Sequence, residues 1–445
     1  MPVYVFDERE MEGRTRHGFR KTGPHRLKFI IESITDLRAN LRDRGSDLIV
    51  RRGKAEDEII AIVEQVGASW VFCNRERTQE EVRVQDALEE HLWTMGQELR
   101  YSRGKMLYHT QDLPFPVRHT PDVFTSFRKE IERIVPVREP FPTPQRMPEV
   151  AAEVERGDIP TLDHYGYGDY ETDSRAVLTF KGGETAGLEQ LDYYLWQTDL
   201  VKTYKETRNG MVGGDYSSKF SCWLAQGNLS PKHIYHELKR YEAERGSNKS
   251  TYWLYFELLW RDFFRLMGKK HGNAIFKVGG PRGQVDRSLR NDRRLLEKWI
   301  EGETGMPLVD ANMRELALTG FMSNRGRQNA ASYLVKDLKV NWQMGAEYFE
   351  SMLIDYDTMS NYGNWNYVAG VGSDPRENRY FNITKQAKRY DPEGEFVKLW
   401  LPVLRPLPAE RVHTPWRMNE SEQHEYGVVI GKDYPEPLTE QYARR

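Results

Sequence analysis

The sequence predicts an α/β domain at the N-terminus followed by a larger, mostly helical domain. Three observations lead to this fold class. Up to about residue 107, short apolar runs alternate with segments of helical periodicity, which is typical of a parallel sheet covered by helices on both faces. From about residue 187, helical periodicity continues almost to the end of the chain. The content of 38% hydrophobic and 30% charged residues is that of a globular protein rather than a disordered one.

The α/β domain is expected over residues 1–110. Its strands are predicted where short apolar runs occur, at 2–7, 47–51 and 70–74, and its helices at 26–44, 55–66 and 80–95. The first helix is the clearest, because its apolar residues lie at helical spacing: Leu27, Ile30, Ile31, Ile34, Leu37 and Leu41. We therefore expect a parallel sheet with these helices packed on it.

The rest of the chain divides into three parts. Residues 111–186 are rich in proline and poor in periodic runs, which predicts a long connector wrapped over the surface. The helical domain is expected over 187–408, with helices at 189–199, 230–245, 251–269, 293–301, 313–319, 326–338 and 346–353. Residues 409–445 become polar from about His413 and are expected to form a loosely packed C-terminal tail.

Charge and cysteine content exclude several classes of site. The net charge is −2, so any nucleic-acid site must be a local basic patch. The two cysteines, Cys73 and Cys222, exclude a disulfide framework, a four-thiolate zinc site and a four-cysteine iron–sulfur cluster, and no metal site is predicted. Without a membrane-length apolar stretch or a signal peptide, we expect the cytoplasm, or an organelle or the nucleus if a targeting segment was lost.

The segment 204–221, YKETRNGMVGGDYSSKFS, is typical of an anion-binding loop. Two glycines loosen the backbone, and three serines and Lys219 then precede the apolar turn CWLA. Serines at a helix start can cap it and leave backbone N–H groups free for an anion such as a pyrophosphate. An ordinary capped helix is the alternative interpretation of this segment.

The segment 252–265, YWLYFELLWRDFFR, places polar side chains in an aromatic helix. Most of its aromatic surface is expected in the core. Glu257, Trp260 and Arg261, however, occupy neighbouring helical positions. A carboxylate beside a Trp and an Arg in an otherwise apolar helix indicates a functional site.

The segment 304–382 carries the strongest pattern. Asn324, Arg327 and Gln328 share one helical face, because residues three and four apart are neighbours on a helix. Asp355 and Asp357 flank a tyrosine and could meet Arg327. A buried Arg–Asp pair adds little stability, so its purpose would be orientation.

The same segment resembles the FAD-binding core of the cryptochrome/photolyase family. DANMREL, TGFMSNRGRQN, SNYGNWNY and DPRENR are similar to the DASH cryptochromes in particular, as are TRNGMVGGDYSSKFS and YWLYFELLWRDFFR upstream. The resemblance covers roughly residues 2–408. It implies a Rossmann-like N-terminal domain and an all-α domain that holds FAD folded in a U.

The resemblance also assigns residues to the cofactor. The positions that match those holding the phosphates, ribose and flavin are Tyr204, Ser217, Ser218, Lys219, Phe220, Ser221, Glu257, Arg261, Phe321, Asn324, Arg327, Asp355, Asp357 and Asn361. Asn361 matches the residue opposite flavin N5, where an amide can hydrogen-bond a protonated N5 but cannot act as an acid. That favours the reduced flavin, which is the electron donor.

A second set of positions matches the pocket for a flipped pyrimidine dimer: Glu257, Trp260, Asn324, Arg325, Gln328 and Tyr367. The catalytic set is Glu257, Trp260, Asn324 and Asn361. Repair photolyases usually have Trp and Met where Tyr367 and Gln328 stand. The smaller, more polar pair offers less stacking energy to offset base flipping, which favours single-stranded DNA as substrate.

The activity implied is blue-light repair of cyclobutane pyrimidine dimers by a photolyase-type lyase. Excited reduced flavin passes one electron to the dimer, two C–C bonds split and the electron returns, while Glu257 stabilises the dimer radical anion. The expected partner is single-stranded DNA that contains dimers, and the protein is expected to be a monomer. The alternative is a blue-light photoreceptor with little or no repair activity.

Photoreduction of FAD in the family uses a relay of three tryptophans. Trp365 and Trp342 match the first two, but Leu289 stands at the third position. Trp299 matches a different, structural position. A nearby Tyr or another Trp could take over the exit step, or photoreduction could be slow.

The N-terminus departs from the family pattern as well. The chain starts at what resembles the second strand, so about one βα unit of the pattern is absent and the sheet is expected to expose an apolar edge. Either the start codon is misassigned or the domain is remodelled. Relatives often hold a folate antenna in this domain, and Glu76 or Glu80 could match the acid that binds 5,10-methenyltetrahydrofolate.

Overall fold

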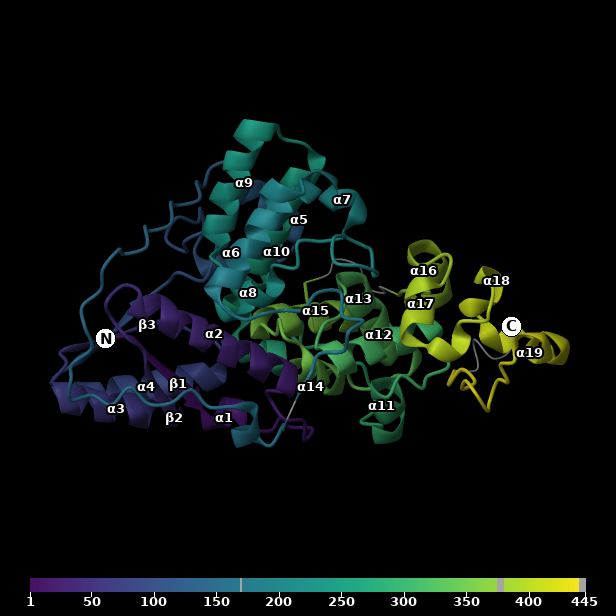
Figure 1. The fold of residues 1–445 in the computed structure, drawn as a ribbon, viewed down its shortest axis with the longest axis horizontal. Helices are drawn as coiled ribbons and strands as arrows, with labels where there is room; N and C mark the ends of the chain where they lie inside the picture. Colours follow the sequence, from purple (N-terminus) through teal and green to yellow (C-terminus); the bar gives the residue numbers. More distant parts are fainter. Residues whose placement is uncertain (169, 374–379, 440–445) are drawn as a thin grey trace.

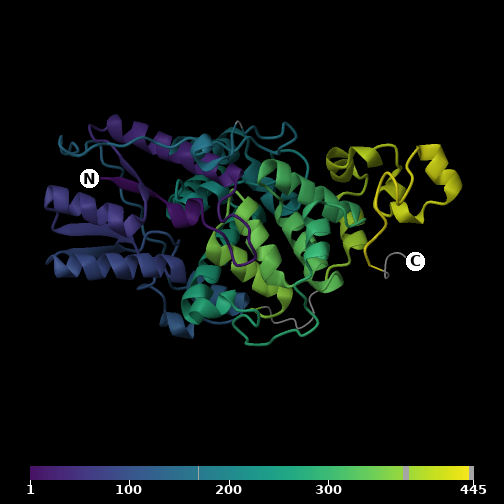
Figure 2. The ribbon, with the colours of Figure 1, turned by 90° about the horizontal axis from the view of Figure 1, so that it is seen from below.

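The protein has an α/β domain at one end, a helical domain in the centre and a small group of C-terminal helices at the other end (Figures 1 and 2). The computed structural model describes residues 1–168, 170–373 and 380–439. The predicted fold class is therefore confirmed. The DPRENR motif at 374–379 and the last residues of the expected tail, 440–445, lie outside the described residues.

The α/β domain has four short parallel strands in two pairs. β1 (Val3–Asp7) pairs with β2 (Ile49–Gly53), and β3 (Trp70–Asn74) pairs with β4 (Glu98–Ser102). Within residues 1–168 these pairs form two separate two-stranded sheets rather than one continuous sheet. Helices connect the strands: α1 (Glu8–Met11), α2 (Pro24–Arg42), α3 (Ala55–Val66) and α4 (Gln79–Thr94).

One face of the sheet of β3 and β4 is covered, and the other exposes two large aromatic residues of β3. Leu99 of β4 packs with Leu88 and Leu92 of α4 and with Val63 of α3 in a small core. On the other face, alternation along β3 leaves Trp70 52% and Phe72 69% exposed. These two aromatic side chains are exposed on the face of the sheet, so they do not test the apolar edge that the sequence predicts.

The connector contains one helix that the sequence analysis did not predict. α5 (Phe124–Glu132) buries Phe124, Phe127 and Ile131 against the helical domain. The remaining described residues of the connector are irregular, apart from short turns at Val117–His119 and Leu162–Tyr165. The connector is thus part of the core of the helical domain rather than only a surface wrap.

The helical domain is built around the 23-residue helix α10. Its helices are α6 (Glu184–Asp192), α7 (Tyr204–Thr207), α8 (Ser221–Gln226), α9 (Pro231–Arg245), α10 (Lys249–His271), α11 (Arg293–Ile300), α12 (Pro307–Thr319), α13 (Asn324–Ser332), α14 (Trp342–Met352) and α15 (Thr358–Ala369). All seven predicted helices overlap with these elements, whereas α7, α8 and α15 were not among the predicted ranges.

The C-terminal residues are packed, which differs from the loose tail that the sequence predicts. α16 (Ile383–Tyr390) and α17 (Glu395–Trp400) are followed by α18 (Ala409–Val412) and α19 (Glu420–Tyr426). Tyr434 is 2% exposed, and its hydroxyl donates to the buried Asp310 carboxylate of α12 at 2.5 Å. Scattered apolar residues among polar ones are enough to anchor this segment.

The α/β domain is joined to the helical domain through α14. The Gly23 N–H, just before α2, donates to the Ser351 carbonyl at 2.9 Å, and the buried Arg26 guanidinium donates to the carbonyl groups of Glu350 and Leu353. In the described part of the chain, no helix is both long and apolar enough to cross a lipid bilayer.

Candidate cofactor and substrate site

A large cavity opens in the helical domain between α10, α13, α15 and the loop before α8. Its volume is about 570 Å³, within the usual range for a small-molecule site. Every residue predicted to bind the cofactor lines it: Tyr204, Ser217, Ser218, Lys219, Phe220, Ser221, Glu257, Arg261, Phe321, Asn324, Arg327, Asp355, Asp357 and Asn361. Residues separated by more than 150 positions in the sequence therefore meet at one site.

One end of the cavity is suited to an anion. Lys219 is only 4% exposed and has φ of 59°, a left-handed conformation that costs about 1–2 kcal/mol for a non-glycine residue. Its ammonium group lies 3.0 Å from the Ser217 hydroxyl and over the Tyr216 ring. Burial lowers the pKa of Lys219 to about 7. No serine side chain caps α8, so the capping role predicted for this segment is wrong and its hydroxyls face the cavity.

The predicted pairing of Arg327 with an aspartate is confirmed for Asp355. Nη2 of Arg327 lies 2.9 Å from Oδ2 of Asp355, and the carboxylate is almost fully buried. Oδ1 of Asp355 and the Tyr216 hydroxyl are buried without a hydrogen-bond partner among the described residues, and both residues line the cavity. Buried polar atoms without partners are costly, so a ligand with hydroxyl or N–H groups fits here.

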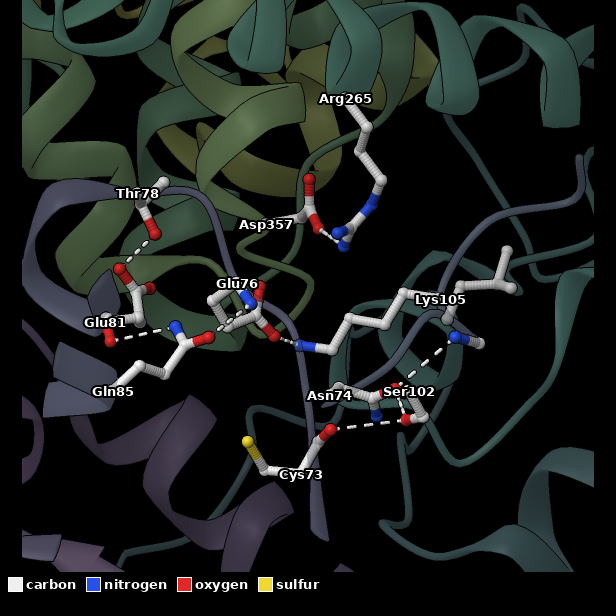
Figure 3. Close-up of polar contacts among 12 residues, drawn as sticks. Cys73, Asn74, Glu76, Thr78, Glu81, Gln85, Ser102, Lys105, Arg265 and Asp357 are labelled. Atoms are coloured by element: carbon white, nitrogen blue, oxygen red, sulfur yellow. Dashed lines mark hydrogen bonds and ion pairs between the residues drawn. The ribbon is translucent and has the colours of Figure 1, made fainter. Parts of the chain in front are cut away.

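Asp357 does not meet Arg327; it pairs with Arg265 of α10 (Figure 3). It also caps α15 by accepting from the Ser360 N–H at 2.9 Å. Burial would raise the pKa of Asp357, but the charges of Arg265 and Arg261 outweigh it and hold the pKa well below its ordinary value. The carboxylate is thus fixed as a permanent anion at the start of the helix that carries Asn361 and Trp365.

Glu257 also has a partner that the sequence did not reveal. Its Oε1 lies 2.5 Å from Nη1 of Arg208, which follows α7, whereas Arg261 donates to the carbonyl groups of Lys105 and Leu224. Burial raises the pKa of Glu257, and Arg208 partly offsets this rise. Arg208 therefore fixes the position of the Glu257 carboxylate, which lines the cavity.

Aromatic rings form one wall of the mouth. Trp260 stacks on Phe124 with ring centroids 3.7 Å apart, and the Tyr367 ring stands perpendicular to Trp260 at 5.9 Å. Gln328 lines the cavity, but Arg325 does not. The Arg325 guanidinium donates to the side chains of Asn209 and Gln328.

The inner end of the cavity is formed by α15. The Asn361 amide donates to the Ala346 carbonyl at 3.0 Å, which leaves the amide oxygen as an acceptor on the cavity side. Trp365, one turn further along, lines the cavity and is 2% exposed. Gly345 makes room for this ring, since a Cβ at that position would lie 2.3 Å from the indole.

The second predicted relay residue, Trp342, lies away from the cavity and is fully buried. Its ring contact is with Tyr362, at 6.2 Å. Leu289 is partly buried and packs against the same core. Trp365 itself contacts Phe349 and Trp299, with centroids 5.1 and 6.4 Å away.

The two candidate folate-binding acids are both in ion pairs. Glu76, which follows β3, pairs with Lys105, and its N–H donates to the Gln85 side chain at 3.1 Å (Figure 3). Glu80 pairs with Lys21. Burial would lower the pKa of Arg265, but the nearby charges of Asp357 and Glu76 raise it.

Arg208 and Arg265 are the main residues that the sequence analysis missed. Arg265 could have been found, because Glu257, Arg261 and Arg265 follow one another at intervals of four on α10. Arg208 carried no such signal, because it reaches Glu257 from a distant part of the chain.

Known proteins share both the sequence and the fold. The family described as the FAD binding domain of DNA photolyase matches residues 253–445, and the DNA photolyase family matches residues 1–145. A cryptochrome DASH from Gloeobacter violaceus is 52% identical over 438 residues, 98% of this chain and 87% of that protein. One from Xenopus laevis is 46% identical over 98% of this chain and 84% of that protein.

Two solved structures extend the comparison. A Synechocystis cryptochrome superimposes with a TM-score of 0.95 at 48% identity, over 99% of this chain and 91% of that one. A bacterial class III photolyase from Agrobacterium tumefaciens has a TM-score of 0.84 at 26% identity, over 100% of this chain and 90% of that one.

Proposed function

This chain belongs to the cryptochrome/photolyase family, in its DASH branch, and on that premise we propose that it repairs cyclobutane pyrimidine dimers in single-stranded DNA. FAD is the cofactor that the matching domain binds. When bound and reduced, the flavin supplies the light-driven electron that splits the dimer. The observation that carries the proposal is the cavity, which joins a buried anion site to an aromatic, carboxylate-bearing mouth.

The chain offers a complete set of contacts for FAD. Lys219 and the serine hydroxyls on either side of it suit the two phosphates, and Arg327 is assigned to the flavin. Asp355 Oδ1 suits a ribose hydroxyl or a ring N–H, because that oxygen has no other partner among the described residues. The Asn361 amide oxygen suits a protonated flavin N5. These groups position and tune the cofactor, and none of them supplies the electron.

The mouth of the cavity is proposed to hold the dimer. Trp260 offers one ring face because Phe124 covers the other, and Tyr367 forms a second wall at right angles. Glu257 would hydrogen-bond the dimer while Arg208 keeps it charged and oriented. Asn324 and Gln328 complete the polar contacts from α13. Arg325 lies beside this mouth, where its charge could reach a phosphate.

The experiment that tests the function is light-driven repair with chemically reduced flavin. The purified protein is irradiated with blue light in the presence of a thymine-dimer oligonucleotide, single-stranded or in duplex, and thymine absorbance is followed. We expect recovery for the single strand and much less for the duplex, because a single strand costs less to flip. No recovery for either substrate would favour the photoreceptor instead.

The preference for single strands is expected to depend on the two small residues at the mouth. In a Gln328→Met, Tyr367→Trp double variant, duplex repair should rise about tenfold, since added stacking contributes about 1–3 kcal/mol per base. The same duplex assay measures this, with single-strand repair as the internal control. If the ratio of duplex repair to single-strand repair does not change in this variant, the preference originates in another part of the surface.

Asn361→Asp is expected to change flavin redox behaviour without unfolding the protein. A carboxylate near N5 disfavours added negative charge, so the two-electron potential should fall by about 30 mV, equal to about 1.4 kcal/mol. Losing the amide donor to Ala346 should cost only about 1 kcal/mol of unfolding free energy. Spectroelectrochemical and denaturant titrations measure the two effects. A loss of stability as large as the loss of FAD occupancy would show that Asn361 does not face the ring.

A folate antenna is proposed at the junction of the two domains. Glu76 is paired with Lys105 and Glu80 with Lys21. Burial and the charges of Arg77, Arg103 and Arg75 lower the pKa of Lys269 to about 8. An extra near-ultraviolet band in the purified protein would support this antenna, and its absence after reconstitution with methenyltetrahydrofolate would exclude it.

A further inference from the structure

The proposed relay lacks an exit from the core. Trp365 lies at the cavity and Trp342 is fully buried, while the position expected to continue toward solvent is Leu289, which cannot be oxidised. A positive charge left on a buried indole is costly and tends to return to the flavin. A photoreduced flavin lasts only if that charge is neutralised, either by movement to the surface or by loss of a proton.

Tyr362 lies where such a step can occur. Its ring stands nearly perpendicular to Trp342, at 79° and a centroid distance of 6.2 Å. It belongs to α15, three residues before Trp365, and so also lies next to the cavity wall without lining it. Its hydroxyl donates to Oε2 of Glu350 at 3.2 Å. Tyr362 therefore combines a ring contact to the relay with a carboxylate that can take its proton.

We propose that Tyr362 is the terminal electron donor for photoreduction of the flavin and that Glu350 accepts its phenolic proton. Trp365, which lines the cavity, would give one electron to a photoexcited oxidised flavin bound there, and Trp342 would refill Trp365. Tyr362 then gives one electron to Trp342 while its O–H bond breaks and the proton forms a new O–H bond on Glu350. The flavin gains one electron, Tyr362 becomes a neutral radical and Glu350 becomes neutral. An external thiol or other reductant later restores the tyrosine.

The surroundings of Glu350 suit this role. Glu350 is partly exposed at the end of α14, so the proton can pass on to solvent. Burial raises the pKa of Glu350 to about 7, although Arg26, hydrogen bonds from Tyr356 and Tyr362, and Lys21 oppose the rise. Burial, followed by the charges of Glu350, Glu347 and Glu80, raises the pKa of Tyr362. Because only the ionised carboxylate accepts a proton, the yield should rise as the pH rises through about 7.

A second aromatic route starts at Trp365 but has no comparable proton acceptor. Trp299 lies 6.4 Å from Trp365, and Tyr348 lies 5.9 Å from Trp299. Among the described residues, no carboxylate accepts a hydrogen bond from the Tyr348 hydroxyl, and burial raises its pKa. Oxidation of Tyr348 would leave a buried charge, so Tyr348 is a matched control for Tyr362.

The test is transient absorption and EPR of the FAD-loaded protein after a blue flash, with flavin initially oxidised. Tyr362→Phe keeps the ring and removes the O–H, and is expected to lower the long-lived reduced-flavin yield about tenfold and abolish the tyrosyl radical signal. Glu350→Gln should lower the yield similarly and remove its rise with pH. Tyr348→Phe should change neither the yield of reduced flavin nor its rise with pH. Leu289→Trp in the Tyr362→Phe background should restore the yield without a tyrosyl signal.

The outcomes separate this inference from the proposed function on which it rests. An unchanged yield in Tyr362→Phe, or a yield lost equally in Tyr348→Phe, would overturn the assignment of Tyr362. Dimer repair with chemically reduced flavin does not use the relay, so it should persist in Tyr362→Phe. Failure of that repair in the unmodified protein would contradict the proposed function, even where the flash experiment gives the expected tyrosyl radical.

Discussion

Replacing Trp365 with Phe is expected to slow light-driven reduction of the bound flavin about a hundredfold. Of the two proposed relay residues, Trp365 is the one that lines the cavity, and it lies one turn after Asn361 on the same helix. A phenylalanine fills most of the same space but is far harder to oxidise, so the first electron transfer fails. The route through Trp299 begins at this ring, 6.4 Å away, and the proposed route through Trp342 also depends on it.

The measurement is the rate of flavin bleaching under continuous blue light with an external thiol. Removing part of a buried indole costs about 2 kcal/mol of stability. The free energy of unfolding of the variant must therefore be compared with that of the unmodified protein. Trp400→Phe is the matched control, because Trp400 is equally buried in α17 and does not line the cavity. Kinetics that do not differ from the unmodified protein would remove Trp365 from the relay.

Asp357→Asn is expected to cost about 3 kcal/mol of stability and most of the bound FAD. Asparagine caps a helix about as well as aspartate, so the hydrogen bond to the Ser360 N–H should survive. What is lost is the negative charge beside Arg265, which is itself mostly buried. A buried Arg265 guanidinium without its counter-charge lowers the stability of the protein far more than the ion pair does. Its movement would also displace the start of α15.

Denaturant unfolding and the FAD absorbance of the purified variant measure these effects. The pKa of Asp357 is held below its ordinary value of 3.8, so its contribution is fully present at neutral pH. That contribution is lost only as the pH falls through the lowered pKa. A second change, Arg265→Met, should recover part of the stability in the Asp357→Asn background. If it recovers none, the ion pair is not the origin of the effect.

Much of the fold could be predicted from the sequence because its signals are local. α3 and β3 begin and end where the apolar periodicity places them, at Ala55–Val66 and Trp70–Asn74. β4 was missed because Glu98–Ser102, ELRYS, is short and half charged. α15 was missed because TMSNYGNWNYVA contains few strong helix formers. Its helix depends on the Asp357 cap and on packing against α10 and α14, which only the folded chain provides.

The residues that form the site could be predicted from the sequence, but the ion pairs between them could not. The cofactor residues predicted from the resemblance all line one cavity. The ionic partners were less predictable, since Asp357 pairs with Arg265 and Glu257 with Arg208. Each partner lies on another element, so its contact depends on how the helices cross. The Trp342–Tyr362 contact could not be predicted either, because it depends on how α14 and α15 cross.

The ion pair between Glu76 and Lys105 bears on whether the first domain can be exchanged independently of the second. Glu76 belongs to the first domain, yet its charge acts on Arg265, the partner of Asp357 beneath the flavin cavity. A charged group of the first domain therefore lies near the ion pair at the start of α15, the helix that carries Asn361 and Trp365. Exchanging that domain between relatives should shift the flavin absorption and potential, so a chimera would not behave as two independent modules.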